Sequence, residues 1–328
     1  MARSIAFREA LREAMNEEMR KDDRVFLMGE EVAEYNGAYK VSQGMLDEFG
    51  PKRVIDTPIS ELGFTAVAVG AAQNGLRPIV EYMTWNFAVL ALDQILNTGS
   101  KMLAMSGGQL GCPIVFRGPN GSAGQLGAQH STAFESYLAN IPGVKVISPS
   151  NPYDAKGLLK AAIRDDDPVM FMESEVMYGE KGEVPEEEYV LPIGRSDIKK
   201  QGNDVTIVSY NKMMKVALGA AAQLDKEGVS AEVIDLRTIR PLDWMTVLES
   251  VKKTNRLVIV EEQWPMCSVS SELAYRIQKE GFDYLDAPVR RITSADAPLH
   301  YAPNLVALAL PDVARTVNLV KEVMYIKK

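Results

Sequence analysis

The chain has 328 residues, 46% of them hydrophobic and 24% charged, and its 36 Lys and Arg against 44 Asp and Glu give a net charge of −8. This balance is typical of a globular protein, and an acidic chain without a basic stripe is a poor partner for nucleic acids or anionic membranes. Two cysteines and two histidines leave no CxxC pair and no imidazole-rich metal centre, and no apolar run approaches the ~20 residues that cross a bilayer. Residues 1–23 carry Glu9, Glu13, Glu17 and Glu18, unlike a signal or transit peptide. We therefore expect a cytoplasmic protein, with a mature organellar form as the alternative.

The first half of the chain alternates helical and strand patterns. Apolar residues over 5–19 recur at helical spacing, and further helices are predicted over 61–74, 86–105, 132–140 and 152–164. Short apolar strands are predicted over 25–28, 79–83, 113–117, 144–148 and 169–173. Such alternation indicates βα units and a mostly parallel sheet covered on both faces.

A change in composition divides the chain. Residues 179–202 are charged and without helical or strand period, which is typical of an exposed connector. The alternation then resumes, with strands predicted over 205–209, 231–236, 257–260 and 289–292 and helices over 212–226, 243–252, 270–280 and 312–325. The predicted fold class is α/β, with two doubly wound domains of mostly parallel sheet over residues 1–190 and 191–328.

Few residues stand out as candidates for chemistry. The chain has no GxSxG elbow, no P-loop and no GxGxxG motif after a strand. His130 follows a glycine-rich loop (118–127) at an expected helix start, where a structural and a functional role both stay open. From its position alone, Glu61 is a first-turn carboxylate favoured by the helix dipole, with Ser60 as N-cap. Asp165, Asp166 and Asp167 share one turn, and such close like charges need solvent or a cation between them.

Several motifs, taken together and in this order, resemble the β-subunit family of 2-oxoacid dehydrogenases. They are DTPISE (56–61), EYMTWNF (81–87), FRGPNG (116–121), QHS (129–131) and VIDLRTIRPL (233–242). Within that family, FRGPNG and YMTWNF look more like the pyruvate enzymes than the branched-chain ones. The resemblance runs from about Ile5 to the C-terminus.

The resemblance implies a thiamine-diphosphate fold, with a pyrimidine-binding domain followed by a transketolase C-terminal-like domain. Glu61 matches the family glutamate that hydrogen-bonds the pyrimidine ring nitrogen and so favours the tautomer whose exocyclic nitrogen deprotonates the thiazolium carbon. Ile59, Met83 and Phe87 match residues that bind the cofactor, and His130 matches a histidine that assists acetyl transfer to a lipoyl group. The resemblance also implies a structural K⁺ site, formed largely by main-chain oxygens, at Ile114, Ala162, Ile163, Asp165 and Asp167. The aspartates stand where the family more usually has an amide.

A missing motif indicates a partner. The family's Gly-Asp-Gly motif for diphosphate and Mg²⁺, followed some thirty residues later by Asn, does not occur here. The resemblance explains its absence, because that motif lies on a separate α subunit and the cofactor binds between the chains. The expected assembly has two α and two β chains, is inactive without α, and covers the apolar residues Leu90, Leu92 and Ile95 of segment 86–105.

The implied function is thiamine-diphosphate-dependent oxidative decarboxylation of pyruvate, with acetyl transfer to the lipoyl group of dihydrolipoyl acetyltransferase. That partner would engage the chain through its subunit-binding and lipoyl domains, with Glu261, Glu262 and Asp296 as candidate contacts. The alternatives are the β subunit of a branched-chain 2-oxoacid or acetoin dehydrogenase, and a non-catalytic scaffold of the same fold. Retention of both Glu61 and His130 argues against the scaffold, which needs neither.

Overall fold

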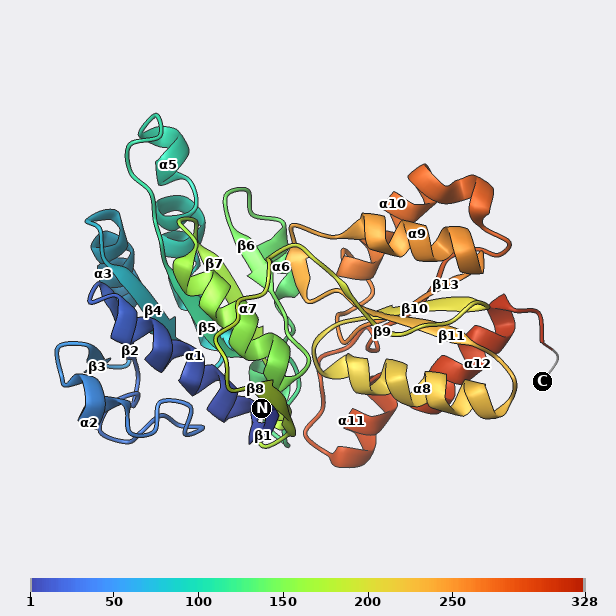
Figure 1. Cartoon of the computed structure of the whole chain (residues 1–328), viewed down its shortest axis with the longest axis horizontal. Helices are drawn as coiled ribbons and strands as arrows, with labels where there is room; N and C mark the ends of the chain where they lie inside the picture. Colours follow the sequence, from blue (N-terminus) through green and yellow to red (C-terminus); the bar gives the residue numbers. More distant parts are fainter. Residues whose placement is uncertain (1, 327–328) are drawn as a thin grey trace.

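The computed structural model describes residues 2–326, which form two α/β halves lying side by side (Figure 1). The first half is built on a seven-stranded sheet of order β12-β6-β7-β5-β4-β2-β3, and the second on a five-stranded sheet of order β14-β13-β10-β11-β9. Only β12 in the first sheet and β9 in the second run antiparallel to their neighbours. The predicted fold class is confirmed.

The central strands are buried on both faces because helices cover both sides of each sheet. The strands of the first sheet are β2 (Val25–Gly29), β3 (Val54–Asp56), β4 (Arg77–Glu81), β5 (Val115–Pro119), β6 (Lys145–Ile147), β7 (Val169–Glu173) and β12 (Thr238–Arg240). Those of the second sheet are β9 (Asp197–Lys200), β10 (Val205–Ser209), β11 (Ala231–Asp235), β13 (Leu257–Val260) and β14 (Arg290–Ile292).

The helices of the first half are α1 (Phe7–Lys21), α2 (Met45–Phe49), α3 (Glu61–Gln73), α4 (Trp85–Ala88), α5 (Met102–Met105), α6 (Glu135–Ala139) and α7 (Pro152–Arg164). Those of the second half are α8 (Met214–Lys226), α9 (Trp244–Thr254), α10 (Val269–Gly281), α11 (Pro303–Ala309) and α12 (Val313–Val323). Several of the longer helices, such as α1, α7 and α9, bury an apolar face against the rest of the chain. No helix within residues 2–326 is both long and apolar enough to cross a membrane.

Two segments differ from the sequence prediction in kind, the connector and the long segment after β4. The connector over residues 179–202 contains two strands, β8 (Lys181–Pro185), which pairs antiparallel with β1 (Ala2–Ala6), and β9, which pairs antiparallel with β11. Segment 86–105 is not one α-helix but α4, a 3-10 turn, a π-helical stretch over Gln94–Gly99 and α5. The wider π winding accompanies close packing on α3, where a Cβ atom on Gly99 would contact the Val69 side chain.

Helix α6 begins three residues later than predicted. The backbone N–H of Thr132 donates to Asn86 Oδ1 at 3.2 Å, and that of Phe134 donates to Asn120 Oδ1 at 2.8 Å. These side chains bind the backbone N–H groups of Thr132 and Phe134 outside a helix, so the helix starts at Glu135. The prediction of a helix beginning at Thr132 is therefore wrong.

Candidate active site

The candidate cofactor residues lie at one edge of the first sheet. Strands β3, β2, β4 and β5 are adjacent and parallel, so their carboxyl ends share an edge. Glu61 begins α3 after β3, Met83 and Phe87 follow β4, and His130 follows β5. The carboxyl edge of a parallel sheet is where α/β proteins place ligand sites.

Glu61 is the first residue of α3 and only 5% exposed. Ser60 occupies the N-cap position as predicted, but its side chain makes no capping hydrogen bond. A second carboxyl group, Glu30, directly follows β2 and is also buried. Burial and, next, the nearby Glu61 charge raise the pKa of Glu30 to about 7. Glu30 Oε1 has no hydrogen-bond partner among the described residues, so a polar group facing this pair would find an open acceptor.

Sequence reasoning missed Glu30. The signal available was its position immediately after a fully apolar strand, because a polar residue there lies at the carboxyl edge of the sheet. The DTPISE motif, by which Glu61 was identified, begins at Asp56 and so points to the segment after β3, not to the one after β2.

The three apolar residues predicted to bind the cofactor follow the strands at this same edge, Ile59 after β3 and Met83 and Phe87 after β4. Ile59 is 85% exposed, whereas Met83 and Phe87 are half-buried. The Phe87 ring meets the His130 imidazole edge-on, with 5.2 Å between ring centroids, so the structure brings these two predicted site residues together. His130 ends a 3-10 turn over Ala128–His130 and does not start an α-helix, so the predicted helix-dipole setting is wrong.

A buried ion cluster stiffens the sheet edge beneath these residues. Arg117 on β5 is fully buried, and its Nε donates to Glu173 Oε1 at 2.6 Å while its Nη1 donates to Glu81. Burial raises the pKa of Glu81. Burial opposes the charge of Arg117, yet the Glu173 and Glu81 carboxylates hold its pKa above the usual value. The cluster joins three neighbouring strands and keeps their ends in register.

Two cationic side chains already contact oxygens of the predicted K⁺ site. Arg77 Nη1 donates to the main-chain oxygens of Ile163 and Asp165, at 3.1 and 3.0 Å. Lys145 Nζ donates to Asp165 Oδ1 at 2.6 Å and to Asp167 Oδ2 at 2.9 Å. The cation expected between these carboxylates is thus a lysine ammonium. In the described residues no group of three or more His, Cys, Asp and Glu side chains is arranged to hold a metal ion.

The remaining predicted oxygens of that site also have backbone partners. The Ile114 carbonyl accepts from Val169 N–H at 2.9 Å, and the Ala162 carbonyl accepts from Asp165 N–H at 3.3 Å. A carbonyl oxygen has two lone pairs, so each keeps room for one further contact.

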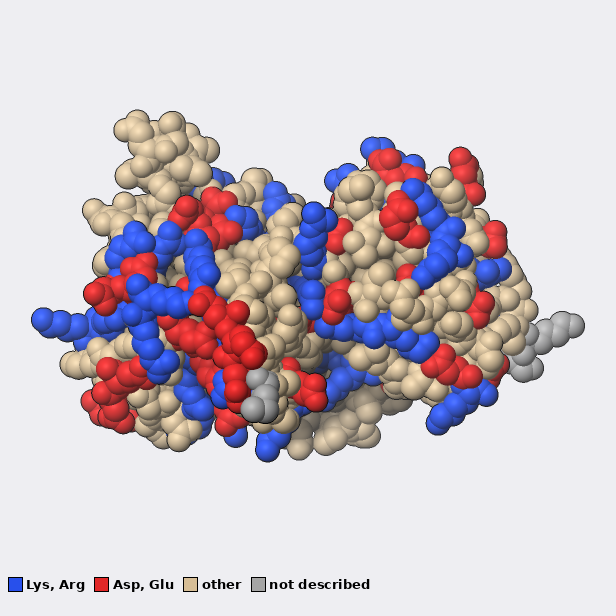
Figure 2. All heavy atoms as spheres, viewed as in Figure 1, with Lys and Arg blue, Asp and Glu red and all other residues tan. Residues whose placement is uncertain are grey.

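An apolar surface lies beside the site on α3 and the segment that follows α4. Leu90 is 65% exposed, and Leu92 is also exposed, as predicted, whereas Ile95 is buried in the chain's own core, so that part of the prediction is wrong. The projection that carries α5 shows no Lys, Arg, Asp or Glu on the face seen in Figure 2, unlike the mixed charges elsewhere on that face. The other exposed large apolar residues of this surface are Leu62, Val67, Val89, Leu103, Met105 and Leu110. So large an apolar surface is typical of a protein interface.

Two of the three acids predicted to contact an acyltransferase core are not available at the surface. Glu261 is fully buried and accepts from Tyr210 Oη at 2.9 Å. The Glu262 carboxylate accepts from Ser122 N–H at 2.6 Å and pairs with Lys212. The prediction is wrong for these two, because carboxylates after a buried strand are held by their own chain. Asp296 is exposed.

Comparisons with known families match both halves of the chain. The transketolase pyrimidine-binding domain family matches residues 3–181, and the transketolase C-terminal domain family matches residues 194–316. A solved structure described as a split-gene transketolase, an inactive β4 tetramer, superposes with a TM-score of 0.80 over 99% of this chain and 100% of its own. At 21% identity, that likeness shows the fold alone.

Curated relatives match almost the whole chain. The pyruvate dehydrogenase E1 component subunit beta of Rhizobium meliloti (strain 1021) is 57% identical over 98% of this chain and 70% of its own length. The protein of the same name from Rickettsia bellii is 55% identical over 98% of this chain and 99% of its own. The mitochondrial subunit beta-2 of Oryza sativa subsp. japonica is 54% identical over 99% of this chain and 87% of its own.

Proposed function

The chain belongs to the family of pyruvate dehydrogenase E1 component β subunits, and from this we propose that it serves as the β subunit of a pyruvate dehydrogenase (acetyl-transferring). In this role it contributes to the oxidative decarboxylation of pyruvate and to acetyl transfer onto a lipoyl group. The observation that carries the proposal is the convergence of Glu61, Met83, Phe87 and His130 on one sheet edge.

The residues at this edge fit the pyrimidine half of thiamine diphosphate. Glu61, buried beside the open Glu30 acceptor, would hydrogen-bond the ring nitrogen, and Ile59, Met83 and Phe87 would cover the apolar ring. When bound, the cofactor supplies a carbon nucleophile and an electron sink for decarboxylation. The contribution of this chain is to hold a proton between Glu61 and the ring and to exclude water around it.

His130 would act at the substrate side of the same site. Its imidazole contacts the Phe87 ring, and its half-buried place in a loop puts it at the edge of the site rather than inside the core. An imidazole there can donate or accept a proton as the acetyl group moves to an incoming lipoyl sulfur.

The partner proposed for this chain is an α subunit, in an assembly of two α and two β chains. The chain has no motif for the cofactor's diphosphate and Mg²⁺, and it exposes a large apolar surface next to Glu61. A second chain that covers this surface would complete the cofactor site. Transfer of the acetyl group also requires a dihydrolipoyl acetyltransferase, for which exposed Asp296 remains a proposed contact.

We also propose that K⁺ binds at the turn after α7, through the free lone pairs of the main-chain oxygens of Ile114, Ala162, Ile163 and Asp165, with Asp167 beside them. The support is that the main-chain oxygens of Ile163 and Asp165 already attract the Arg77 guanidinium, and that the carboxylates of Asp165 and Asp167 already attract the Lys145 ammonium. Oxygen ligands of this kind suit a hard cation.

The function is tested by co-expressing the chain with an α subunit and assaying thiamine-diphosphate-dependent oxidation of pyruvate beside 3-methyl-2-oxobutanoate. We expect activity only from the pair, with pyruvate preferred. Preference for the branched acid would keep the mechanism and assign the chain to a branched-chain enzyme. A tight but inactive complex would overturn the catalytic role in favour of a scaffold.

A further inference from the structure

The loop that carries His130 is held at its start by the second half of the chain. Ser122 N–H donates to Glu262 Oε1 at 2.6 Å, and Lys212 Nζ donates to Ser122 Oγ at 2.7 Å and to the Ser122 carbonyl oxygen. Lys212 Nζ and Glu262 Oε2 are themselves 2.7 Å apart. Every polar group of Ser122 is therefore bonded to one of two oppositely charged side chains from the other half.

This arrangement leaves little freedom at the loop start. Gly121, at φ 72°, lies so close to the Glu262 carboxylate that a Cβ atom there would collide with it. The N–H of Gly121 donates to the Thr132 carbonyl at 3.1 Å, which ties the loop start to the residues just after His130. Fixing Ser122 therefore also fixes the end of the loop from which the imidazole extends.

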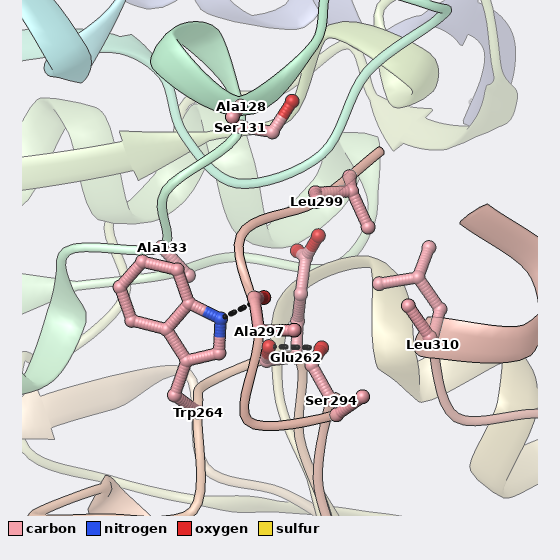
Figure 3. Close-up of a pocket in the computed structure, with 11 residues that line it drawn as sticks. Ala128, Ser131, Ala133, Glu262, Trp264, Ser294, Ala297, Leu299 and Leu310 are labelled. Atoms are coloured by element: carbon pink, nitrogen blue, oxygen red, sulfur yellow. Dashed lines mark hydrogen bonds between the residues drawn. The ribbon is translucent and has the colours of Figure 1, made fainter. Parts of the chain in front are cut away.

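The two charged residues come from the carboxyl edge of the second sheet. Lys212 follows β10 and Glu262 follows β13, its parallel neighbour. Figure 3 shows the Glu262 side chain extending toward the side of a small cavity where Ala128 and Ser131 lie, the residues on either side of the segment that contains His130. The cavity, of about 20 Å³, is completed by Trp264, Ser294 and neighbouring apolar residues of the second half. The carboxyl edge of a parallel sheet is where α/β proteins usually bind ligands. In this chain, that edge of the second sheet binds the loop that carries His130.

We propose that Lys212 and Glu262 are positioning residues for His130, so that the second half of the chain determines how effectively the imidazole assists acetyl transfer. This inference rests on the proposed function. A charged pair that is almost fully buried holds its partners in one geometry, because any movement would leave a buried charge without its counterion.

The test is the double variant Lys212→Met with Glu262→Gln, studied with an α subunit. Removing both charges avoids an isolated buried ion, so the chain is expected to fold. We expect acetylation of a lipoyl domain to fall about tenfold while decarboxylation with an artificial electron acceptor changes less than about twofold. Hydrogen–deuterium exchange at the amides of residues 122–131 is expected to rise.

Glu232→Gln is the matched control. Glu232 is another buried glutamate of the second half paired with a lysine, Lys253, but it does not contact the loop. It should change neither the ratio of the two activities nor exchange in residues 122–131. Lys212→Arg, which keeps the charge, should retain most of the wild-type ratio of lipoyl acetylation to decarboxylation. Ser122→Ala, which removes one hydroxyl contact and leaves the charged pair intact, tests the loop should the double variant not fold.

The outcomes separate the inference from the function. Equal losses in both assays, or unchanged exchange in residues 122–131 of the double variant, would overturn the positioning role. A wild-type complex that oxidises pyruvate with an artificial acceptor but never acetylates a lipoyl domain would overturn the proposed function instead, and exchange would still show whether the pair holds the loop.

Discussion

Glu30 and Glu61 lie together at the carboxyl edge of the first sheet, and their proximity has a consequence for stability. An unfolded glutamate loses its proton near its ordinary pKa of 4.5, whereas burial and the Glu61 charge hold the proton on Glu30 to about pH 7. Between these values the folded chain binds more protons than the unfolded chain, so a rise in pH favours unfolding. Other buried glutamates with a raised pKa, such as Glu81 and Glu135, act in the same direction.

The isolated chain should therefore lose stability as pH rises from about 4.5 to about 7, and Glu30→Gln should flatten that loss, because the amide does not ionise. Urea midpoints of the two chains across this range provide the measurement. Parallel pH curves for wild type and Glu30→Gln would show that the Glu30 pKa is not raised.

Glu61→Gln should reduce pyruvate oxidation by at least about 100-fold, because an amide cannot hold a proton against the pyrimidine nitrogen. Assembly with the α chain should be unchanged, since the substitution preserves size and adds no charge. Steady-state rates and size-exclusion chromatography of the same preparations check both parts. Near-normal turnover would remove Glu61 from the catalytic machinery.

His130→Ala should impair lipoyl acetylation more than decarboxylation with an artificial acceptor, by about tenfold in the ratio of the two rates. The reason is that the His130 imidazole lies beside Phe87, on a loop at the edge of the site. Decarboxylation depends on Glu61, which lies on another element. His300, exposed and in the second half, offers His300→Ala as the control. A proportionate loss in both assays would contradict the role in acetyl transfer.

The residues of the site illustrate what the sequence could and could not predict. Motifs identified Glu61 and His130, and the sequence pattern predicted Glu61 in the first turn of a helix, as the structure has it. Glu30 was missed because none of the motifs includes it, and its place after an apolar strand does not reveal that β2 pairs with β3 and so brings it near Glu61. The exposure of Glu261 and Glu262 was mispredicted for the same reason: Lys212 and Tyr210, which bind them, lie about fifty residues away.

At the scale of single elements, the segment after β4 departs furthest from its prediction. Its apolar residues suggested one long helix, but the structure divides it into shorter turns, with Ile95 buried and Gly99 packed against α3. The apolar residues left outside, Leu90 among them, form the surface beside Glu61. The hydrophobic pattern predicted the helical character, whereas the winding depends on packing against another element.

Leu90→Asp should weaken assembly with the α chain by about tenfold or more, because a charge would have to be desolvated in the interface. Met245→Asp on α9 is the control, since its side chain is 61% exposed, close to the 65% of Leu90, and lies in the other half. Analytical ultracentrifugation of the purified pairs measures the difference. Equal assembly of both variants would place the α subunit on another surface.

The turn after α7 gives a second prediction at this scale. If K⁺ binds its carbonyl oxygens, the melting temperature of the chain should be higher in potassium chloride than in the same concentration of tetramethylammonium chloride. Asp167→Asn, which restores the amide more usual in the family, should preserve the difference. Equal melting temperatures would mean that Lys145 and Arg77 satisfy this turn without a metal ion.

At the scale of the molecule, the sequence predicted two α/β units and a mostly parallel arrangement, because buried parallel strands read as short apolar runs between amphipathic helices. It did not predict β9 or β12, which are short and partly polar. The division at residue 190 and the cellular compartment stay predictions.

The most consequential of these missed elements is β12, which belongs by sequence to the second half yet forms the outer strand of the first sheet, beside β6. During synthesis Thr238 is added long after Ile147, its partner on β6. The β6 edge of the first sheet therefore stays unpaired until that part of the second half has been synthesised. An open strand edge is a template for pairing with other chains. β12, the last strand of this sheet to be synthesised, thus covers the β6 edge, and a truncated product ending before it would expose that edge to aggregation.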